Sequence, residues 1–258
     1  MPPGGAFDPI SLGLANVLVG NAPDALGIEF ALASAVIVND GEVTFSVVGA
    51  ADLRRVTLQT GEKYHLFAQT NGCRTYLCVP GGISMTCGTK LTSGFKLSLE
   101  LSPALRELRL SDPPISLNSG PIRVTVGPQA HLFDIKDLVK RDYRVSRLAS
   151  RMGLRLEGSV QSHRHDLPSE PCVPGAVQVT PDGTLIVLGP DGPTLGGYPK
   201  PIVVISADLP RVGQLSPGAP ISFEIVHLEE ALRCYHDQQQ RVSKLLSEIR
   251  LRGITPAL

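Results

Sequence analysis

The chain has 258 residues, and its 24 basic and 24 acidic side chains give a formal net charge of zero. This balance gives no indication of the basic surface typical of nucleic-acid or anionic-membrane binders, and 5% aromatic residues with no Trp argue against a platform for stacking bases. We expect a cytoplasmic protein with no nucleic-acid or membrane partner. We expect no signal peptide, because Met1 is followed by Pro-Pro-Gly-Gly and not by a charged and then an apolar region, and the longest apolar run, 30–38, is too short to span a bilayer.

A helix is predicted near the start of the chain. Asp8 is a favourable N-cap, Pro9 suits the first helical position, and Gly20 with Asn21 provides a stop. Between these ends apolar residues recur at helical spacing, so one face of this helix should be buried.

Short β-strands are predicted for most of the remaining chain. Alternating or short apolar runs bounded by Gly, Pro and Asp predict strands at 43–48, 75–79, 95–102, 122–126, 177–179, 185–188, 202–205 and 221–225. Many short strands with frequent turns favour barrels or sandwiches over a parallel α/β sheet. The predicted fold class is therefore mainly β.

Three parts are expected along the chain. Turn residues between 111 and 120 separate a first β unit with the N-terminal helix, 1–115, from a second β unit, 116–226. A C-terminal helix, 227–252, follows, because this segment lacks Gly and Pro and carries apolar residues at 4–3 spacing. The stripe comprises Leu228, Leu232, Tyr235, Val242, Leu246 and Ile249, with Gln239 at its one polar position. We expect the stripe to pack on the chain's own barrel; the alternative is a dimer seam.

Common enzymatic motifs are missing from the sequence. It contains neither a Gly-x4-Gly-Lys-[Ser/Thr] phosphate loop nor a Gly-x-Ser-x-Gly nucleophile elbow. The segment 163–166 with Cys172 fits no standard zinc spacing, so no metal site is predicted. The five cysteines form an odd set without paired spacing, which does not indicate a disulfide framework.

The most informative stretch for binding runs from 174 to 200. Gln178 lies on a predicted strand and should point away from the face of its neighbours, Val177 and Val179. Gly196 and Gly197 allow a backbone to approach a ligand closely.

Two positions in this stretch, Tyr198 and Lys200, each precede a proline. Both are therefore biased to an extended backbone, which should make the phenol and the ammonium project together. Such a pair could hold a carboxylate. An exposed hairpin turn is the alternative reading of the same residues.

Several ordered segments resemble one family, the carboxyltransferase-like proteins that include the C subunit of 5-oxoprolinase, allophanate hydrolase subunit 2 and the C-terminal part of urea carboxylase. The matching segments are 5–8, 14–21 with Glu29, 49–50, 72–82, 150–158, 169–170, 175–178, 196–200, 206–209, 214–218 and Phe223. The resemblance spans nearly the whole chain, and its most specific part is 169–200.

The resemblance implies two cyclophilin-like β-barrel units and a subunit of an ATP-dependent 5-oxoprolinase-type amidohydrolase that opens a cyclic or linear amide. ATP would act through the complex. The partners would be a homologous protein that resembles the B subunit of 5-oxoprolinase, together with a protein that resembles its A subunit. A biotin-dependent carboxyltransferase component is an alternative that the same resemblance allows.

The resemblance also suggests roles for the candidate site residues. Lys200 would hold an oxyanion or carboxylate, and Gln178 would hydrogen-bond the amide, beside Gly196, Gly197 and Tyr198. Asp191 would orient Lys200 or accept a proton, and Asp8 would join from the first barrel.

Three departures from the family pattern favour a further alternative, a non-catalytic binding or regulatory subunit. The family's early Gln-Asp-x-Gly-Arg segment has no counterpart before residue 5, and its Gly-Ser-Arg-Ser-Thr stretch is replaced by 87–94. The family's Arg and Gln before the double glycine are Gly192 and Pro193 here.

Overall fold

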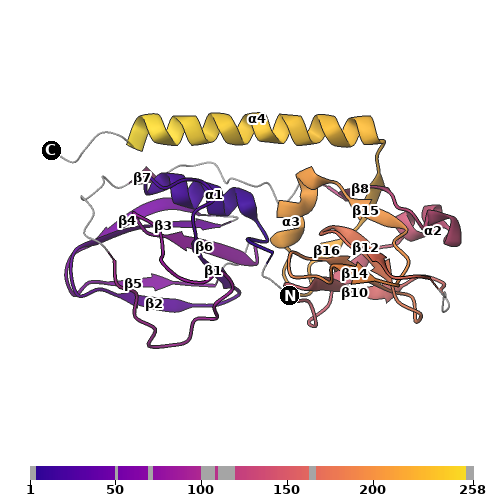
Figure 1. Ribbon diagram of the computed structural model, residues 1–258, viewed down its shortest axis with the longest axis horizontal. Helices are drawn as coiled ribbons and strands as arrows, with labels where there is room; N and C mark the ends of the chain where they lie inside the picture. Colours follow the sequence, from indigo (N-terminus) through magenta and orange to yellow (C-terminus); the bar gives the residue numbers. More distant parts are fainter. Residues whose placement is uncertain are drawn as a thin grey trace. The chain divides into compact units, whose positions relative to one another are not determined.

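The computed structural model describes residues 4–49, 52–68, 72–99, 108–109, 120–162 and 167–253. It divides into two compact units (Figure 1). The N-terminal unit contains the described residues of 8–117 and 240–258, and the C-terminal unit contains those of 1–7 and 118–239. The fold is mainly β with a helix near each end of the chain, which confirms the predicted fold class.

Helix α1 (Pro9–Leu18) opens the N-terminal unit as predicted. The Asp8 carboxylate caps it by accepting from the Ser11 N–H at 3.0 Å, with Pro9 in the first turn. Gly20 follows the helix with a φ of +82°, in the left-handed region that glycine adopts without strain. Almost the whole helix is buried, and it packs on β3, β4 and β6.

Two sheets build the rest of the N-terminal unit. The larger has the strand order β1-β6-β3-β4-β7 and the smaller pairs β2 with β5, all antiparallel. The strands are β1 (Ile28–Ala31), β2 (Ala35–Val38), β3 (Val43–Gly49), β4 (Leu53–Leu58), β5 (Lys63–Leu66), β6 (Arg74–Cys78) and β7 (Leu108–Arg109). Phe45 and Val47 face a core shared with β2 and β5, whereas Ser46 on the other side donates to Ala15 of α1. This alternation is the one that the sequence predicted.

The strand expected at 95–102 is wrong over residues 95–99, which form no regular element. Leu97 packs against the core of the unit, but Phe95 and Leu99 are exposed. The alternating apolar residues at 95–99 therefore do not pair with a neighbouring strand in the described part of the chain. Residues 100–102 lie outside the described residues.

A buried polar network ties α1 to the larger sheet. The Tyr76 hydroxyl accepts from the Asp8 N–H at 2.9 Å and donates to Glu29 at 2.8 Å, and Arg74 pairs with Glu29 at 3.2 Å. Burial, more than the neighbouring carboxylates, raises the pKa of Tyr76 well above its ordinary value. Tyr76 is therefore a neutral hydrogen-bonding link between α1, β1 and β6.

We expect Tyr76→Phe to lower the free energy of unfolding by about 1–3 kcal/mol, because the buried Asp8 N–H and the partly buried Glu29 carboxylate each lose a hydrogen bond. Urea denaturation measures this. Tyr64→Phe is a matched control, since the Tyr64 ring packs on Phe45 while its hydroxyl makes no hydrogen bond among the described residues. Equal losses in the two variants would contradict a role for the network.

The C-terminal unit is an eight-stranded sheet that closes nearly into a barrel. The strand order is β16-β9-β10-β13-β12-β15-β8-β17, antiparallel except for the parallel pair β17–β8. Its strands are β8 (Ile122–Val126), β9 (Tyr143–Val145), β10 (Gly153–Ser159), β12 (Ala176–Val179), β13 (Thr184–Leu188), β15 (Ile202–Val204), β16 (Pro220–Ile221) and β17 (Phe223–Ile225). The helical segments of the unit are η1 (Ala130–Leu132), α2 (Ile135–Lys140), η2 (Ser206–Asp208) and α3 (Leu209–Gly213), and the short strands β11 (Glu170–Pro171) and β14 (Leu195–Gly196) pair separately.

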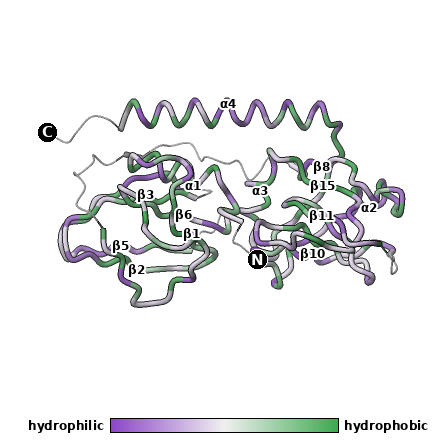
Figure 2. Tube along the Cα trace, in the orientation of Figure 1, coloured by the Kyte–Doolittle hydropathy of each residue, from purple (hydrophilic) through white to green (hydrophobic). Residues whose placement is uncertain are grey.

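One residue, Ser222, joins the two edge strands of this sheet. The single strand expected at 221–225 is therefore two short strands: β16 pairs with β9 at one edge, and β17 pairs with β8 at the other. The Ser222 carbonyl also accepts from the Ile122 N–H at 2.8 Å. Because consecutive residues pair with opposite edges of the sheet, the sheet wraps around the apolar core of the unit. Figure 2 shows hydrophobic residues, in green, along the strands of this unit.

The start of the chain belongs to the C-terminal unit, which differs from the expected first part at 1–115. Phe7 lies in the barrel core, the Gly4 N–H donates to Asp191 at 2.9 Å, and Arg151 donates to the Gly5 carbonyl. These contacts join residues more than 140 positions apart, which local sequence patterns do not reveal.

Helix α4 (Leu228–Gly253) matches the expected C-terminal helix within one residue, but the expected buried stripe is wrong in its first half. Leu228, Leu232 and Tyr235 are 67%, 49% and 39% exposed. The face that packs on the C-terminal unit instead carries Ala231 and Cys234, which join Ile205, Ala207 and Val226 in a small core. Small side chains let the helix approach closely, which explains why this face is used. Further along the helix, Ile249 of the stripe is buried.

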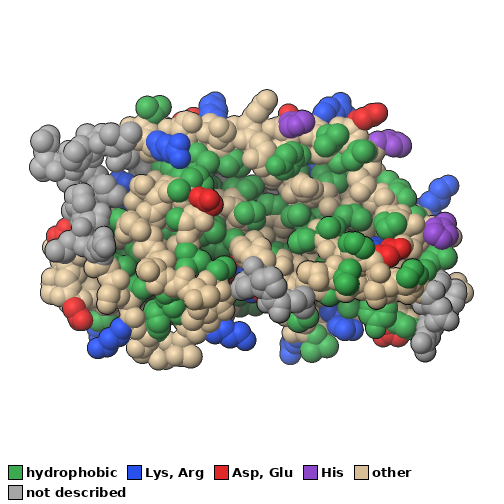
Figure 3. Space-filling model, in the orientation of Figure 1, with side chains coloured by type: hydrophobic (Ala, Val, Ile, Leu, Met, Phe, Trp, Pro, Cys, Tyr) green, Lys and Arg blue, Asp and Glu red, His purple; other side chains and the backbone are tan. Residues whose placement is uncertain are grey.

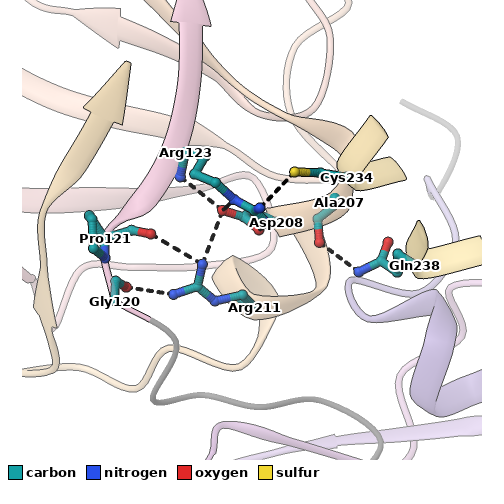
Figure 4. Close-up of polar contacts among 8 residues, drawn as sticks. All are labelled: Gly120, Pro121, Arg123, Ala207, Asp208, Arg211, Cys234 and Gln238. Carbon is teal, nitrogen blue, oxygen red and sulfur yellow. Dashed lines mark hydrogen bonds and ion pairs between the residues drawn. The ribbon is translucent and has the colours of Figure 1, made fainter. Parts of the chain in front are cut away.

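A buried ion cluster lies under this half of α4 (Figure 4). Asp208 accepts from the Arg123 backbone at 2.8 Å, from the Arg123 guanidinium at 2.6 and 3.1 Å, and from Arg211 at 3.0 Å. Arg123 also donates to the Cys234 thiol at 2.8 Å, and Gln238 donates to the Ala207 carbonyl at 2.7 Å. The cluster therefore connects β8, η2, α3 and α4.

Charged side chains of both signs are scattered over the face shown in Figure 3, in keeping with the net charge of zero. Within the described residues, no helix combines the length and apolar character needed to cross a bilayer.

Candidate functional site

The candidate site lies beside the barrel of the C-terminal unit, where β12 and the segments flanking β8 and β15 meet the β11–β14 ribbon. In this ribbon Glu170 pairs with Gly196 and Pro171 pairs with Leu195. A chain of contacts then runs from the Gln178 amide to the Cys172 thiol and on to the Glu170 backbone carbonyl, at 3.5 and 3.7 Å. The Glu170 carboxylate in turn contacts Lys200 and Gln129. Most of the positions that the sequence singled out are in or next to this chain.

Gln178 points away from the barrel core, as the sequence predicted. Its strand neighbours Val177 and Val179 are core residues, whereas the Gln178 amide lies against the ribbon. Gln178 is only 4% exposed, and the one hydrogen bond of its side chain among the described residues is a weak contact from Nε2 to Cys172 Sγ at 3.5 Å. A buried amide normally satisfies more of its hydrogen-bonding capacity, so this group can accept a ligand as a partner.

Lys200 is 5% exposed and is held by loose contacts. Its ammonium lies 3.4 Å from Glu170 Oε2 and 3.5 Å from the Tyr198 carbonyl oxygen, both longer than an ordinary hydrogen bond. The Lys200 backbone N–H, in contrast, donates to Gln129 Oε1 at 3.0 Å, and Gln129 Nε2 donates to Glu170 Oε2 at 2.9 Å. The backbone is thus fixed while a buried cation keeps donor capacity for a ligand.

Tyr198 and Lys200 are both near the ribbon but differ in exposure. Tyr198 is 44% exposed, whereas Lys200 is buried, and the contact of Lys200 is with the Tyr198 backbone carbonyl. Gly196 packs on the Gln178 amide: a Cβ there would lie 2.7 Å from Nε2 and 3.1 Å from Cys172 Sγ. At Gly197 the nearest atom would be the Leu167 carbonyl oxygen at 3.3 Å.

We expect Gly196→Ala to weaken ligand binding at least roughly tenfold, because the new methyl group displaces the Gln178 amide and the Cys172 thiol. Gly41→Ala is the control, because a Cβ at Gly41 would meet no atom within 4 Å, and it should change the affinity little. Isothermal titration with a small amide ligand compares them. Equal affinities for the two variants would place the ligand away from Gln178.

Asp191 is engaged by Arg151 and the start of the chain. Its carboxylate accepts from Arg151 Nε at 2.7 Å, from Arg151 Nη2 at 3.1 Å and from the Gly4 N–H at 2.9 Å. The hydrogen bond from Arg151 lowers the pKa of Asp191 below its ordinary value. The counter-ion of Lys200 in the structure is Glu170, whereas the sequence suggested Asp191.

Asp8 belongs to the N-terminal unit, where it caps α1. It is fully buried, and its N–H donates to the Tyr76 hydroxyl. In the structure Asp8 therefore stabilises the start of α1.

Sequence reasoning missed Gln129, Glu170 and Cys172 as members of the site. Gln129 is 71 residues from Lys200 and contacts it only through the fold. Glu170 carried a signal, because it lies in the segment 169–170 that resembles the family, yet nothing in its spacing indicated a partner.

The described residues contain no group of three or more side chains suited to hold a metal ion. The segment 163–166, considered above for metal binding, lies outside the described residues.

Comparisons with known proteins identify similar sequences and folds. The family model "Carboxyltransferase domain, subdomain A and B" matches residues 1–87 and 85–225. The C subunit of 5-oxoprolinase from Escherichia coli K12 is 32% identical over 93% of this chain and 88% of its own length. Among solved structures, TTHA0988 is similar with a TM-score of 0.76 and 30% identity, over 85% of this chain and 50% of its own. The urea carboxylase of Kluyveromyces lactis is similar in fold, with a TM-score of 0.79 and 24% identity over 95% of this chain. This chain spans about half of the TTHA0988 chain and covers 26% of the urea carboxylase chain.

Proposed function

Since the chain belongs to the family of carboxyltransferase domains with subdomains A and B, we propose that it is a subunit of an ATP-dependent 5-oxoprolinase-type amidohydrolase. In this complex it acts with a homologous partner protein to open a cyclic or linear amide. The observation that carries the proposal is the presence of two buried, weakly hydrogen-bonded polar groups, Lys200 and Gln178, linked through Glu170 and Cys172.

These two groups suit the chemistry of an amide. A carbonyl oxygen that gains negative charge as its carbon is attacked is stabilised by an ammonium such as Lys200. Gln178 has both a donor and an acceptor, so it can hydrogen-bond the amide carbonyl or the amide N–H and orient the ring. Burial strengthens both interactions, because little water competes at 4–5% exposure.

ATP does not suit this site itself. A triphosphate needs several cationic or backbone donors, whereas Lys200 is the buried cation here and a carboxylate, Glu170, lies 3.4 Å away. We therefore place ATP on another protein of the complex, where its hydrolysis drives the opening of a stable lactam. The task of this chain is then to bind the amide and stabilise the charge that develops on its oxygen.

The complex itself provides the test. Co-expression with the homologous B-like protein and with the A-like protein should yield one larger species on gel filtration, with ATP hydrolysis that depends on 5-oxoproline. Omitting this chain should abolish the coupled activity. Hydrolysis of ATP in response to 5-oxoproline by the isolated chain would contradict the proposal, as would unchanged activity without it.

A second candidate, a carboxyltransferase component that uses biotin, is supported by the likeness to urea carboxylase. The neutral ureido ring of biotin carries the same donor and acceptor groups as an amide, which Lys200 and Gln178 could bind. When bound, that cofactor would supply the carboxyl group. Transfer of radiolabelled carboxylate from carboxybiotin in the presence of this chain separates this candidate from the first.

A third candidate is a non-catalytic binding protein within the complex. Gly192 and Pro193 in place of the Arg and Gln of the resembled family favour it. Binding of small amides without any turnover in the assembled complex would support it.

A further inference from the structure

We propose that Glu170 is a built-in stand-in for a carboxylate on the ligand, and that an anionic ligand binds by displacing Glu170 from Lys200. This inference rests on the proposed function and narrows its substrate class to small amides that carry one carboxylate group. It gives a role to a residue that the proposed amide chemistry leaves unused.

Two donors converge on one oxygen of Glu170. Gln129 Nε2 lies 2.9 Å from Oε2, and Lys200 Nζ lies 3.4 Å from the same atom. The orientation of the Gln129 amide is fixed, because its Oε1 accepts from the Lys200 backbone N–H at 3.0 Å. Gln129 and Lys200 are both buried and therefore stay in place whichever anion they bind. The position of Oε2 marks where an oxygen of a ligand carboxylate would bind. Because the Lys200 ammonium has three N–H donors, it can bind this carboxylate and still donate to the oxygen of the amide.

The pairing of Glu170 with Lys200 is loose enough to be exchanged. The 3.4 Å separation is longer than a charge-assisted hydrogen bond, which is usually near 2.7–2.9 Å. The Glu170 side chain is 39% exposed, so its carboxylate can turn into water, whereas the Lys200 side chain cannot leave its buried position as easily. When a ligand carboxylate takes the place of Glu170, the 3.4 Å contact between Lys200 and Glu170 is thus replaced by a shorter contact between Lys200 and the ligand. The displaced Glu170 carboxylate enters water, so it loses no solvation.

The charges in the site require that a ligand carboxylate replaces the Glu170 carboxylate beside Lys200, because it cannot bind next to it. Lys200 and Glu170 carry one positive and one negative charge, so the unliganded pair is neutral. A ligand carboxylate placed beside an unmoved Glu170 would meet like charge, with no second buried cation among the described residues of the site to offset it. A neutral amide, in contrast, can bind Gln178 with Glu170 in place.

The first experiment needs no amide ligand. Glu170→Ala removes the stand-in and leaves Lys200 buried without its counter-ion, so acetate should bind in its place and raise the melting temperature. We expect a saturable rise of at least about 2 °C in acetate relative to chloride at equal ionic strength. Wild type and the control Glu157→Ala, which removes an exposed glutamate of the same unit, should show no such rise. Adding Lys200→Met to Glu170→Ala should abolish it. An acetate response that is equal in wild type and Glu170→Ala overturns the inference.

The second experiment uses Glu170→Gln, which keeps an oxygen for Gln129 and removes the charge. We expect 5-oxoproline to bind roughly three- to tenfold tighter than to wild type, and its carboxylate-free analogue 2-pyrrolidinone to bind equally well to both. Weaker binding of 5-oxoproline by the variant would instead make Glu170 a direct ligand and overturn the inference. If neither lactam binds any form of the protein while acetate acts as expected on Glu170→Ala, the proposed amide function fails and the role of Glu170 stands.

Discussion

Replacing Asp208 with asparagine should lower the free energy of unfolding of the C-terminal unit by about 3–5 kcal/mol. Asp208 is fully buried and accepts hydrogen bonds from Arg123 and Arg211. Burial lowers the pKa of Arg211, which shows how poorly that guanidinium is solvated, and its Nε has no partner among the described residues. Without the Asp208 carboxylate the buried positive charge of Arg211 is left uncompensated. The free-energy cost of this unpaired charge is the main reason for the expected loss of stability.

Asp137→Asn is the matched control, because it makes the same chemical change in an exposed pair. Asp137 lies in the first turn of α2 and Arg141 directly follows the helix, and both side chains are 46% exposed. This variant should leave the free energy of unfolding nearly unchanged, because an ion pair exposed to water contributes little to stability. Chemical denaturation followed by circular dichroism measures both. Similar losses in the two variants would mean that the buried cluster does not hold the unit together.

The second large effect is expected at Lys200, where methionine should lower kcat of the assembled complex about 10²–10³-fold. Methionine keeps most of the apolar length of the side chain and removes the charge that would stabilise the oxyanion. Turnover of 5-oxoproline coupled to ATP hydrolysis is the measurement.

Lys136→Met controls for the loss of a positive charge, since Lys136 lies exposed on α2. It should leave kcat unchanged. A thermal scan of Lys200→Met separates a loss of chemistry from a loss of folding. If the variant melts normally and turns over as fast as wild type, Lys200 does not stabilise the transition state.

The elements that the sequence predicted well are those fixed by local rules. Asp8 and Pro9 mark the first turn of α1 because capping and the fixed φ of proline act within a few residues. The alternation that turns Gln178 away from Val177 and Val179 is likewise a property of one strand. The same holds for the length of α4, which contains no Gly or Pro before its last residue.

Features that depend on distant partners could not be predicted. Residues 221–225 alternate like one strand, yet Ser222 divides them between two sheet edges because β8 and β9 lie on opposite sides of the barrel opening. Residues 95–99 also alternate between apolar and polar side chains, yet they form no strand, because no neighbouring strand in the part of the chain that the structure describes pairs with them. In the site, Lys200 was found from its prolines, but its partners Gln129 and Glu170 lie 71 and 30 residues away, and no local pattern connects them.

The closure of the barrel through Ser222 has a consequence for biosynthesis. Strand β8 acquires its parallel neighbour β17 only after about a hundred further residues have been made, and Phe7 enters the same core from the start of the chain. On a ribosome, β8 therefore lacks its neighbour β17 until residues 220–225 have left the exit tunnel. Phe7 cannot be buried in the completed core before that point. Such non-local closure is slow and exposes apolar surface for the duration of translation. A nascent chain stalled before residue 220 should accordingly remain bound to chaperones, whereas one released after α4 should not.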